Sequence, residues 1–338
     1  MTAQVNVGLI GAGRIGRVHA ETLAYRIPEA NLVAVADVFL DAAEKCAADY
    51  HIPLATSDPQ VLLDDKTIDA VIICSSTDTH AQFISAAAKA GKHIFCEKPI
   101  ALDLGVIDQA LAAVEQSGVK LQLGFNRRFD PNFKQAHDMV AAGKIGTPHI
   151  VHIISRDPAP PPVEYIKVSG GIFLDQTIHD FDMARFLIDS EVEEIYAAGG
   201  VMVDPAIGAA GDIDTAVVTL RYASGAIGVI DNSRRAVYGY DQRIEVFGSA
   251  GSVVVANKTP HTAVYNNADS VQSAKPLYFF LERYMDAYLD EMKAFINCIG
   301  QDTPPPVTGR DGRIPVVMGL AAWKSYRENR PVKLAEIA

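Results

Sequence analysis

The sequence has few cysteines and no long apolar segment. Its 338 residues include only four cysteines, and the scattered positions of Cys46, Cys74, Cys96 and Cys298 give no metal-ligand spacing. Free thiols suit a reducing compartment, with a disulfide between Cys74 and Cys96 as the alternative. No apolar run reaches the roughly 20 residues that a membrane-spanning helix needs, and the first residues lack the basic segment of a signal peptide. We therefore expect a cytoplasmic protein without a bound metal or a membrane partner.

Basic residues are outnumbered by acidic ones. The chain has 30 lysines and arginines against 41 aspartates and glutamates, for a formal net charge of −11. Such a chain is a poor partner for nucleic acid or an anionic membrane surface. The sequence also lacks the G-x-S-x-G, Walker and H-E-x-x-H motifs, so nothing in it supports a hydrolase, an ATPase or a metalloprotease. His149 and His152 lie three apart in a strand-like run and point to opposite faces, so this pair does not predict a metal site.

The beginning of the chain carries a dinucleotide-binding pattern. The apolar run Val5–Ile10 predicts a buried strand, three glycines follow it, and Arg14–Tyr25 reads as a helix. Gly11 permits the tight turn from strand to helix, Gly13 lets the backbone approach a pyrophosphate, and Gly16 lets the helix pack closely on the strand. The free N–H groups at the helix start then face the anion. The alternative is a glycine-rich turn in some other α/β unit.

An acidic residue at the expected distance strengthens this prediction. A second apolar run, Leu32–Ala36, ends at Asp37, about 20 residues beyond the last glycine. A carboxylate there accepts hydrogen bonds from the adenosine ribose and repels a 2′-phosphate, so NAD is favoured over NADP. Arg14 could favour a 2′-phosphate, but we expect the effect of Asp37 to dominate. We expect the cofactor, NAD, to contact Gly11, Ala12, Gly13, Arg14, Ile15, Gly16, Asp37, Val38, Ser75, Ser76, Thr77, His80, Glu97 and Lys98.

The order of segments predicts an α/β protein of two domains. Residues 1–123 alternate strand-like and helix-like runs, which is typical of a doubly wound parallel sheet, the Rossmann arrangement. Residues 124–338 contain consecutive strand-like runs, which predict an α+β domain with a large, mostly antiparallel sheet. We assign NAD binding to the first domain, and substrate binding and oligomerisation to the second. A large sheet with one uncovered face favours a homo-oligomer.

Some local features of the chain can be predicted as well. Ser57 is expected to cap a helix over residues 59–65, and Leu174–Ile188 is expected to form one continuous helix. Ala206–Gly211 is interpreted as a flexible connector. The last helix, Arg310–Glu328, can pack back on the first domain.

A lysine follows one of the expected parallel strands. Glu97-Lys98-Pro99 comes directly after the run His93–Cys96, and ligands in open α/β sheets bind beyond the carboxyl ends of the strands. Lys98 could there hold a substrate hydroxyl and offset charge that develops on its oxygen. The alternative is an ordinary solvated lysine before a proline.

Asp175 and His179 form the second candidate pair. On one helix these positions, four apart, share a face. His179 is the natural proton acceptor near neutral pH, and Asp175 can orient its imidazole or bind a substrate hydroxyl. The alternative for His179 is a histidine of the core. The neighbouring Asp180 and Asp182 are interpreted as solvated or structural.

Further candidates lie on loops. Asn126-Arg127-Arg128 follows the last strand of the first domain, where Arg127 could bind polar substrate groups or form an interdomain salt bridge. Asp157 and Tyr238 are weaker candidates, because acidic and aromatic residues on loops are often structural.

These features together resemble the glucose-fructose oxidoreductase/inositol dehydrogenase/rhizopine catabolism (Gfo/Idh/MocA) family over nearly the whole chain. The marks are Gly11–Gly16, Glu97-Lys98-Pro99 and the pair Asp175 and His179. Three stretches, residues 124–130, 155–162 and 175–187, are most similar to the myo-inositol 2-dehydrogenases of that family. The resemblance implies catalytic roles for Lys98, Asp175 and His179, and a homotetramer built through the second domain. It maps substrate contacts onto Asn126, Arg127, Asp157 and Tyr238.

The expected reaction is therefore the NAD-dependent oxidation of a secondary alcohol of a cyclic polyol, with myo-inositol as the expected substrate. The alternatives are a sister enzyme acting on a sugar or on scyllo-inositol, and a non-catalytic NAD-responsive regulator on the same scaffold. A regulator could lose the lysine and the histidine, and both are present here.

Overall fold

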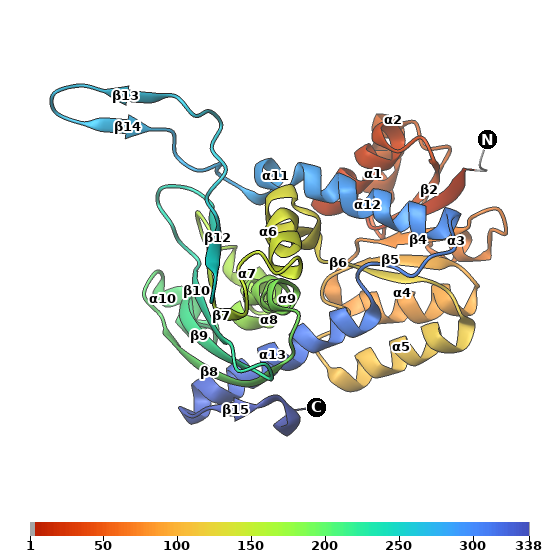
Figure 1. The fold of residues 1–338 in the computed structure, drawn as a ribbon. Helices are drawn as coiled ribbons and strands as arrows, with labels where there is room; N and C mark the ends of the chain where they lie inside the picture. Colours follow the sequence, from red (N-terminus) through yellow and green to blue (C-terminus); the bar gives the residue numbers. More distant parts are fainter. Residues whose placement is uncertain (1–3, 338) are drawn as a thin grey trace. The chain divides into compact units, whose positions relative to one another are not determined.

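The computed structural model describes residues 4–337 and divides into two compact units (Figure 1). Of the described residues, 4–129 and 286–314 make up the first unit, and 130–285 and 315–337 make up the second. The sequence pattern predicts a boundary between residues 123 and 124, with the last helix able to pack back on the first domain. In the structure the chain returns to the first unit at residues 286–314.

The first unit is built on a parallel sheet. Its six strands are arranged in the order β3-β2-β1-β4-β5-β6, and every neighbouring pair is parallel. The strands are β1 (Val5–Ile10), β2 (Ala30–Ala36), β3 (Leu54–Thr56), β4 (Ala70–Ile73), β5 (His93–Glu97) and β6 (Leu121–Gly124). The doubly wound order, which reverses direction next to β1, confirms the expected Rossmann arrangement.

Helices connect these strands and cover the sheet (Figure 1). They are α1 (Arg14–Arg26), α2 (Leu40–Tyr50), α3 (Gln60–Asp64), α4 (Thr77–Lys89), α5 (Leu104–Ser117), the short 3-10 helix η1 (Asn126–Phe129) and α12 (Met285–Gly300). Leu289, Met292 and Phe295 of α12 join the same buried cluster as Leu9 of β1 and Phe95 of β5. A helix from the far end of the sequence thus completes the core of the first unit.

The second unit is built on a seven-stranded mixed sheet in the order β12-β11-β7-β10-β9-β8-β15. Only β7 and β10 run parallel, and the other neighbours are antiparallel, as expected. The strands are β7 (Pro148–Arg156), β8 (Val192–Gly200), β9 (Thr215–Tyr222), β10 (Ile227–Ser233), β11 (Asp241–Gly248), β12 (Gly251–Val255) and β15 (Val332–Lys333). A separate hairpin, β13 (Val264–Asn266) and β14 (Val271–Ser273), extends from this unit (Figure 1).

The helices of the second unit are short, apart from three. They are α6 (Pro131–Ala141), α7 (Val163–Ile166), α8 (Ile172–Asp175), α9 (Thr177–Ile188), α10 (Pro205–Ala209), α11 (Phe280–Arg283), the 3-10 helix η2 (Leu334–Glu336) and the part of α13 (Gly309–Glu328) that begins at Pro315. The side chains of β7 alternate, with Val151, Ile153 and Ser155 buried on one face and Ile150 exposed on the other.

The structure corrects three local predictions. Residues 174–188 do not form one helix, because Gln176 separates α8 from α9. Residues 206–211 are not simply a flexible connector, since Asp204 caps the helix α10 by accepting a hydrogen bond from the Ala206 N–H. Ser57 does not cap α3, where the Asp58 carboxylate accepts from the Gln60 N–H instead.

The cysteines and the helices bear on two further expectations. All four cysteines are buried and free, so the alternative disulfide is not formed. Across residues 4–337, no helix is long and apolar enough to cross a membrane.

Candidate functional site

The glycine loop between β1 and α1 has the geometry that the sequence pattern predicts. Gly11 has a φ of +99°, and a Cβ on it would lie 2.6 Å from the backbone of Cys74 and Ser75. A Cβ on Gly16 would lie 1.9 Å from the Gly11 carbonyl oxygen. The fold itself therefore requires glycine at these two positions. Around Gly13, no atom of residues 4–337 lies within 4 Å of an added Cβ, so packing does not explain that glycine.

The start of α1 can accept an anion. Gly13 is the N-cap and provides no side-chain capping bond, and the first turn contains no acidic residue. The first N–H groups of a helix have no partner within the helix, and together with the helix dipole they favour a phosphate. These residues fit the pyrophosphate of a dinucleotide, which agrees with the close approach predicted at Gly13.

Asp37 lies at the end of β2 and is tied to the glycine loop. Its Oδ2 atom accepts a hydrogen bond from the Ala12 N–H at 2.7 Å, and its Oδ1 atom accepts from the Phe39 N–H at 2.9 Å. A carboxylate oxygen has more than one acceptor position, so these bonds leave capacity for ribose hydroxyls. Val38 beside it is 80% exposed. The carboxylate thus shapes the loop, and its contact with a ribose remains a prediction.

The loops after β4 and β5 are joined by His80. Its ring nitrogens lie 2.8 Å from the Pro99 carbonyl oxygen and 3.0 Å from the Ser75 carbonyl oxygen, and the side chain is buried. The Ser75 and Thr79 hydroxyls are 2.7 Å apart. The Lys98–Pro99 peptide bond is cis, and Lys98 is partly buried. His80 therefore holds two loops that the sequence assigns to the cofactor, and its own contact with the cofactor stays a prediction.

Three other predicted residues of the first unit are wholly or largely buried. Asn126 and Arg127 lie on η1 with exposures of 3% and 4%. Glu97 directs its Oε1 atom toward the imidazole of His19, whose Nε2 atom lies 2.8 Å away. Glu97 thus faces the core of the unit, while Lys98 is the next residue along the chain.

Asp175 belongs to a charged cluster in the second unit. Its Oδ1 atom accepts a hydrogen bond from the Tyr165 hydroxyl at 2.9 Å, and its Oδ2 atom accepts from Arg234 at 3.1 Å. The same guanidinium also contacts Asp212 at 3.2 Å, and Asp212 accepts a bond from the Ile172 N–H. Arg234 and Asp212 are buried. Two carboxylates therefore share one buried guanidinium.

Tyr165 serves this cluster as a hydrogen-bond donor. Tyr165 is 48% exposed, yet partial desolvation of its hydroxyl, followed by the charge of the neighbouring Asp175 carboxylate, raises the pKa of Tyr165. The phenol therefore stays protonated over the ordinary pH range and donates to Asp175. The position of the Asp175 carboxylate is fixed from both sides, by a neutral donor and by a cation.

His179 lies on α9, one turn beyond Asp175 on α8. Both side chains are partly exposed, whereas the residues between them are buried. Asp180 and Asp182 next to His179 are fully buried, and Asp180 accepts a hydrogen bond from the Asn232 amide at 2.8 Å. These two aspartates are therefore not solvated, and the structural alternative holds for Asp180. The exposure pattern sets Asp175 and His179 apart from the surrounding core.

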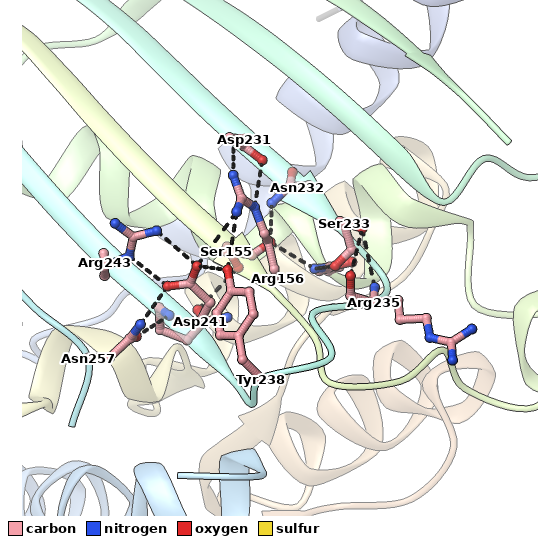
Figure 2. A network of polar contacts seen from close by, with 12 residues as sticks. Ser155, Arg156, Asp231, Asn232, Ser233, Arg235, Tyr238, Asp241, Arg243 and Asn257 are labelled. Atoms are coloured by element: carbon pink, nitrogen blue, oxygen red, sulfur yellow. Dashed lines mark hydrogen bonds and ion pairs between the residues drawn. The ribbon is translucent and has the colours of Figure 1, made fainter. Parts of the chain in front are cut away.

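Tyr238 belongs to a different network of hydrogen bonds and ion pairs (Figure 2). Its hydroxyl donates to Asp241 at 2.5 Å and accepts from Arg156 at 3.2 Å, and Arg156 also pairs with Asp231. Burial alone would raise the pKa of Asp241, but hydrogen bonds from Arg243, Tyr238 and a third side chain outweigh it and lower the pKa to about 2. The structure thus does not join the Tyr238 hydroxyl to the Asp175 cluster.

Asp157 lies on the segment that follows β7. Its backbone N–H bonds to the Ser233 carbonyl oxygen at 2.9 Å, and its carbonyl oxygen accepts from the Ala236 N–H. These bonds place it beside the end of β10, directly before Arg234. Burial alone would lower the pKa of Arg234, but the charges of Asp175 and Asp212, and to a smaller extent that of Asp157, outweigh burial and raise the pKa. Its contact with substrate stays a prediction.

Arg234 and Tyr165 were not among the residues predicted from the sequence. A signal for Arg234 was present, because the buried residues of β10 alternate at Gly228, Ile230 and Asn232, and Arg234 is the next residue of this alternation. A cation in the buried phase of a strand indicates a buried anion. For Tyr165 there was no comparable indication, because its short helix follows a run of prolines.

Comparisons with known proteins agree with this architecture. Residues 5–125 match the family described as an oxidoreductase family with an NAD-binding Rossmann fold, and residues 133–254 match the GFO/IDH/MocA C-terminal domain. The chain is 52% identical to the myo-inositol 2-dehydrogenase of Thermotoga maritima, over 98% of this chain and 99% of that protein. It is 47% identical to the inositol 2-dehydrogenase of Rhizobium meliloti, again over 98% of this chain and 99% of that protein.

A solved structure extends the comparison to bound ligands. The scyllo-inositol dehydrogenase of Lactobacillus casei, crystallised with bound cofactor NAD(H) and scyllo-inositol, is similar to this chain with a TM-score of 0.92 and 30% identity. The similarity covers 98% of this chain and 99% of that one. The chain therefore belongs to the GFO/IDH/MocA family of oxidoreductases and carries the NAD-binding Rossmann domain of that family.

Proposed function

We propose that this protein oxidises one secondary hydroxyl of a cyclic polyol, with myo-inositol as substrate and 2-keto-myo-inositol as product. NAD supplies the hydride acceptor when it is bound. The observation that carries the proposal is the partly exposed pair Asp175 and His179 in an otherwise buried segment, with Asp175 held by Tyr165 and Arg234. The two relatives at 52% and 47% identity are named as inositol 2-dehydrogenases, whereas the scyllo-inositol enzyme described above shares 30%.

The proposed chemistry assigns one task to each side chain. His179 accepts the proton of the reacting hydroxyl at a ring nitrogen. The carboxylate of Asp175, one turn before His179, favours the imidazolium that this transfer creates. Lys98 donates a hydrogen bond to the reacting oxygen and offsets its developing negative charge. Charged donors and acceptors of this kind suit a ring that carries a hydroxyl on every carbon, because a site built to bind hydroxyls rejects analogues that lack one.

The first unit holds the cofactor in this proposal. The N–H groups at the start of α1 bind the pyrophosphate, and Asp37 accepts from the ribose hydroxyls. Ser75, Ser76 and Thr77 border the same edge of the sheet. Substrate contacts from Asn126, Arg127, Asp157 and Tyr238 complete the proposal, although the hydroxyl of Tyr238 first has to leave Asp241 and Arg156.

A polyol panel with NAD tests the proposal. The protein is mixed with NAD and, in turn, myo-inositol, scyllo-inositol and common pyranoses, and NADH formation is followed by absorbance. We expect the highest kcat/KM with myo-inositol and the loss of that activity in His179→Ala. A higher value with a pyranose or with scyllo-inositol would identify a sister enzyme of different specificity. NAD binding without turnover of any compound would indicate the regulator.

We also propose a homo-oligomer, a tetramer by resemblance, that forms through the open face of the seven-stranded sheet. Ile150 and Phe247 on this face are 43% and 48% exposed, and with Val229 they line a shallow hollow that also includes His152 and Glu245. Glu245 lies directly opposite His152 in the ladder between β7 and β11. Apolar side chains beside polar groups that can pair with one another suit a second copy of the same face.

Light scattering tests the assembly. A mass several times that of one chain is expected, and Phe247→Glu should lower it by placing a charge in the apolar hollow. A mass equal to one chain at all concentrations refutes the assembly.

The four free, buried cysteines support a reducing compartment such as the cytoplasm as the location of the reaction.

A further inference from the structure

A buried cluster of ionisable groups lies behind the Glu97-Lys98-Pro99 loop in the first unit. It consists of His19 from α1, Glu97 from the end of β5 and Glu291 from α12. One nitrogen or oxygen atom of each residue lies within 4.8 Å of one atom of each of the others. His19 and Glu291 have no exposed surface. The cluster is therefore part of the core, and the proposed chemistry does not use it.

The carboxyl group of Glu291 has no partner within residues 4–337. Neither of its oxygens accepts or donates a hydrogen bond there, and no salt bridge reaches it. The ionisable groups around it are His19 of α1, Cys74 directly after β4 and Glu97 of β5, and His19 also packs edge-on against Tyr288, one turn before Glu291 on α12. None of these groups is a lysine or an arginine. Burial, and then the charge of Glu97, raise the pKa of Glu291 well above its usual range. An isolated buried carboxylate costs far more than a buried carboxylic acid.

Glu97 is held from two sides. Its Oε1 atom lies 2.8 Å from the Nε2 atom of His19, and in the tautomer with a proton on Nε2 the imidazole donates to it. A Cβ on Gly124 of β6 would lie 2.9 Å from Glu97 Oε2, so the glycine gives the carboxylate room against the next strand. Glu97 directly precedes Lys98, so a displacement of the Glu97 carboxylate is passed on to Lys98 through the backbone.

We propose that Glu291 is a positioning residue that remains a neutral acid beside the Glu97 carboxylate and thereby keeps the Glu97-Lys98 segment in place for NAD-dependent turnover. When Glu291 ionises at alkaline pH, two carboxylates without a cation face each other, and their repulsion displaces Glu97 and with it Lys98. This inference rests on the role of Lys98 in the proposed function. The matching variant is Glu291→Gln, because a carboxamide has the shape of a neutral acid and cannot ionise.

The direction of the pH effect follows from linkage. In the unfolded chain a glutamate ionises near pH 4.3, whereas Glu291 in the folded chain ionises at higher pH. Between these two pH values the folded wild-type protein binds one proton more than the unfolded chain does. The free energy of unfolding of the wild type, compared with that of Glu291→Gln, therefore falls as the pH rises and levels off above the pKa of Glu291 in the folded protein. Asp290→Asn is the control, because Asp290 is an exposed neighbour on α12 and its substitution removes the same formal charge.

Infrared spectroscopy tests the protonation state directly. At neutral pH the wild-type protein and Asp290→Asn should show the carbonyl band of a buried carboxylic acid, and Glu291→Gln should lack it. This measurement does not depend on the identity of the substrate. An ionised Glu291 at neutral pH overturns the inference, as does a stoichiometric metal ion that elemental analysis finds in the wild type and not in Glu291→Gln.

Activity tests the positioning role. With the best substrate of the polyol panel, Glu291→Gln should keep kcat within about twofold of wild type at neutral pH and extend activity to higher pH. Glu291→Ala should lose about tenfold or more in kcat, with KM little changed, because small displacements of catalytic groups are costly. An identical alkaline limit in the wild type and Glu291→Gln, or a Glu291→Gln protein that fails to fold, overturns the inference.

The two proposals fail in different ways. If no polyol or sugar is turned over, the proposed function fails, and the infrared band together with the pH dependence of NAD affinity still tests Glu291. In that case wild-type NAD affinity should fall at alkaline pH and that of Glu291→Gln should not. Equal pH profiles for NAD affinity in the two proteins overturn the inference about Glu291 alone.

Discussion

Replacing Arg234 by methionine should destabilise the second unit strongly. Arg234 is 1% exposed and is the only cation in contact with the buried Asp212 among the interactions described for residues 4–337. Methionine has a similar volume and keeps the packing, but it leaves Asp212 and Asp175 without this counter-charge. Removal of one partner from a buried ion pair generally costs about 3–5 kcal/mol, because the remaining charge stays buried.

The remaining contacts set the expected position within that range. Asp212 keeps the hydrogen bond from the Ile172 N–H, and Asp175 keeps the one from the Tyr165 hydroxyl. Asp175 is also partly exposed, so water can solvate its charge once the arginine is gone. We therefore expect the lower part of the range, about 3 kcal/mol.

The assay uses the single tryptophan of the chain. Trp323 belongs to the second unit, its indole N–H donates to the Gly170 carbonyl oxygen, and it packs edge-on against Phe173. A Cβ on Gly171 would lie within 2.7 Å of both Trp323 and Asp212, so the fluorophore is close to the affected carboxylate. Urea unfolding followed by its fluorescence therefore reports this unit. With a slope of about 2–3 kcal/mol per molar urea, the midpoint should fall by about 1 M or more.

The neighbouring arginine provides the control. Arg235 is exposed and loses the same charge in Arg235→Met, yet surface substitutions usually stay within about 0.5 kcal/mol. Arg234→Met should also lose turnover at temperatures where it remains folded, because Asp175 is no longer held. Equal urea midpoints for the two variants would refute the view that one buried guanidinium holds both carboxylates.

Three further predictions concern the proposed active site and the cofactor site. His179→Ala should lower kcat by about two or more powers of ten with unchanged NAD affinity, as expected for loss of a general base; unchanged turnover in steady-state kinetics would remove His179 from the mechanism. Asp37→Ala should narrow the preference for NAD over NADP, measured as the ratio of kcat/KM values, and an unaltered ratio contradicts the ribose contact. Gly16→Ala should destabilise the first unit, because its Cβ would lie 1.9 Å from the Gly11 carbonyl oxygen, whereas Gly13→Ala should melt normally and bind NAD weakly in calorimetry. Equal behaviour of the two glycine variants argues against their different roles.

The parts of the fold that could be predicted are those that short segments determine. The bounds of β1 agree with the expected run Val5–Ile10, and α1 begins at the expected Arg14, because an apolar run and an amphipathic stretch on either side of the glycine turn specify them. The glycine loop was also predictable, since the need for glycine at positions 11 and 16 arises within one strand-turn-helix unit. Local sequence carries this information without any distant contact.

The break between α8 and α9 could not be predicted in this way. No glycine or proline marks it. The Gln176 side chain instead donates to the carbonyl oxygens of Ser155 and Ser233, and the Thr177 hydroxyl contacts Asn232. These partners lie on β7 and β10, more than 20 residues away along the chain, so the break depends on tertiary structure. The cap of α10 is different, because the local sequence Asp204-Pro205 is typical of a helix start, with an N-cap aspartate before a proline in the first turn. The interpretation of residues 206–211 as a connector did not use this pattern.

The two buried carboxyl systems represent opposite solutions to the same physical problem. In the second unit, Asp212 is compensated by a cation, so its charge is retained and the fold depends on Arg234. In the first unit, the ionisable groups described around Glu291 are His19, Cys74, Glu97 and Tyr288, none of which is a lysine or an arginine, so the protonated state of Glu291 costs less free energy than the ionised one. Removal of charge should therefore have opposite consequences: Arg234→Met destabilises, whereas Glu291→Gln is tolerated and gains stability relative to wild type as the pH rises. Because the two sites lie in different units and share no partner, their effects on unfolding free energy should add in the double variant. If the core simply did not tolerate the replacement of its polar residues, both variants would instead be less stable than the wild type at every pH.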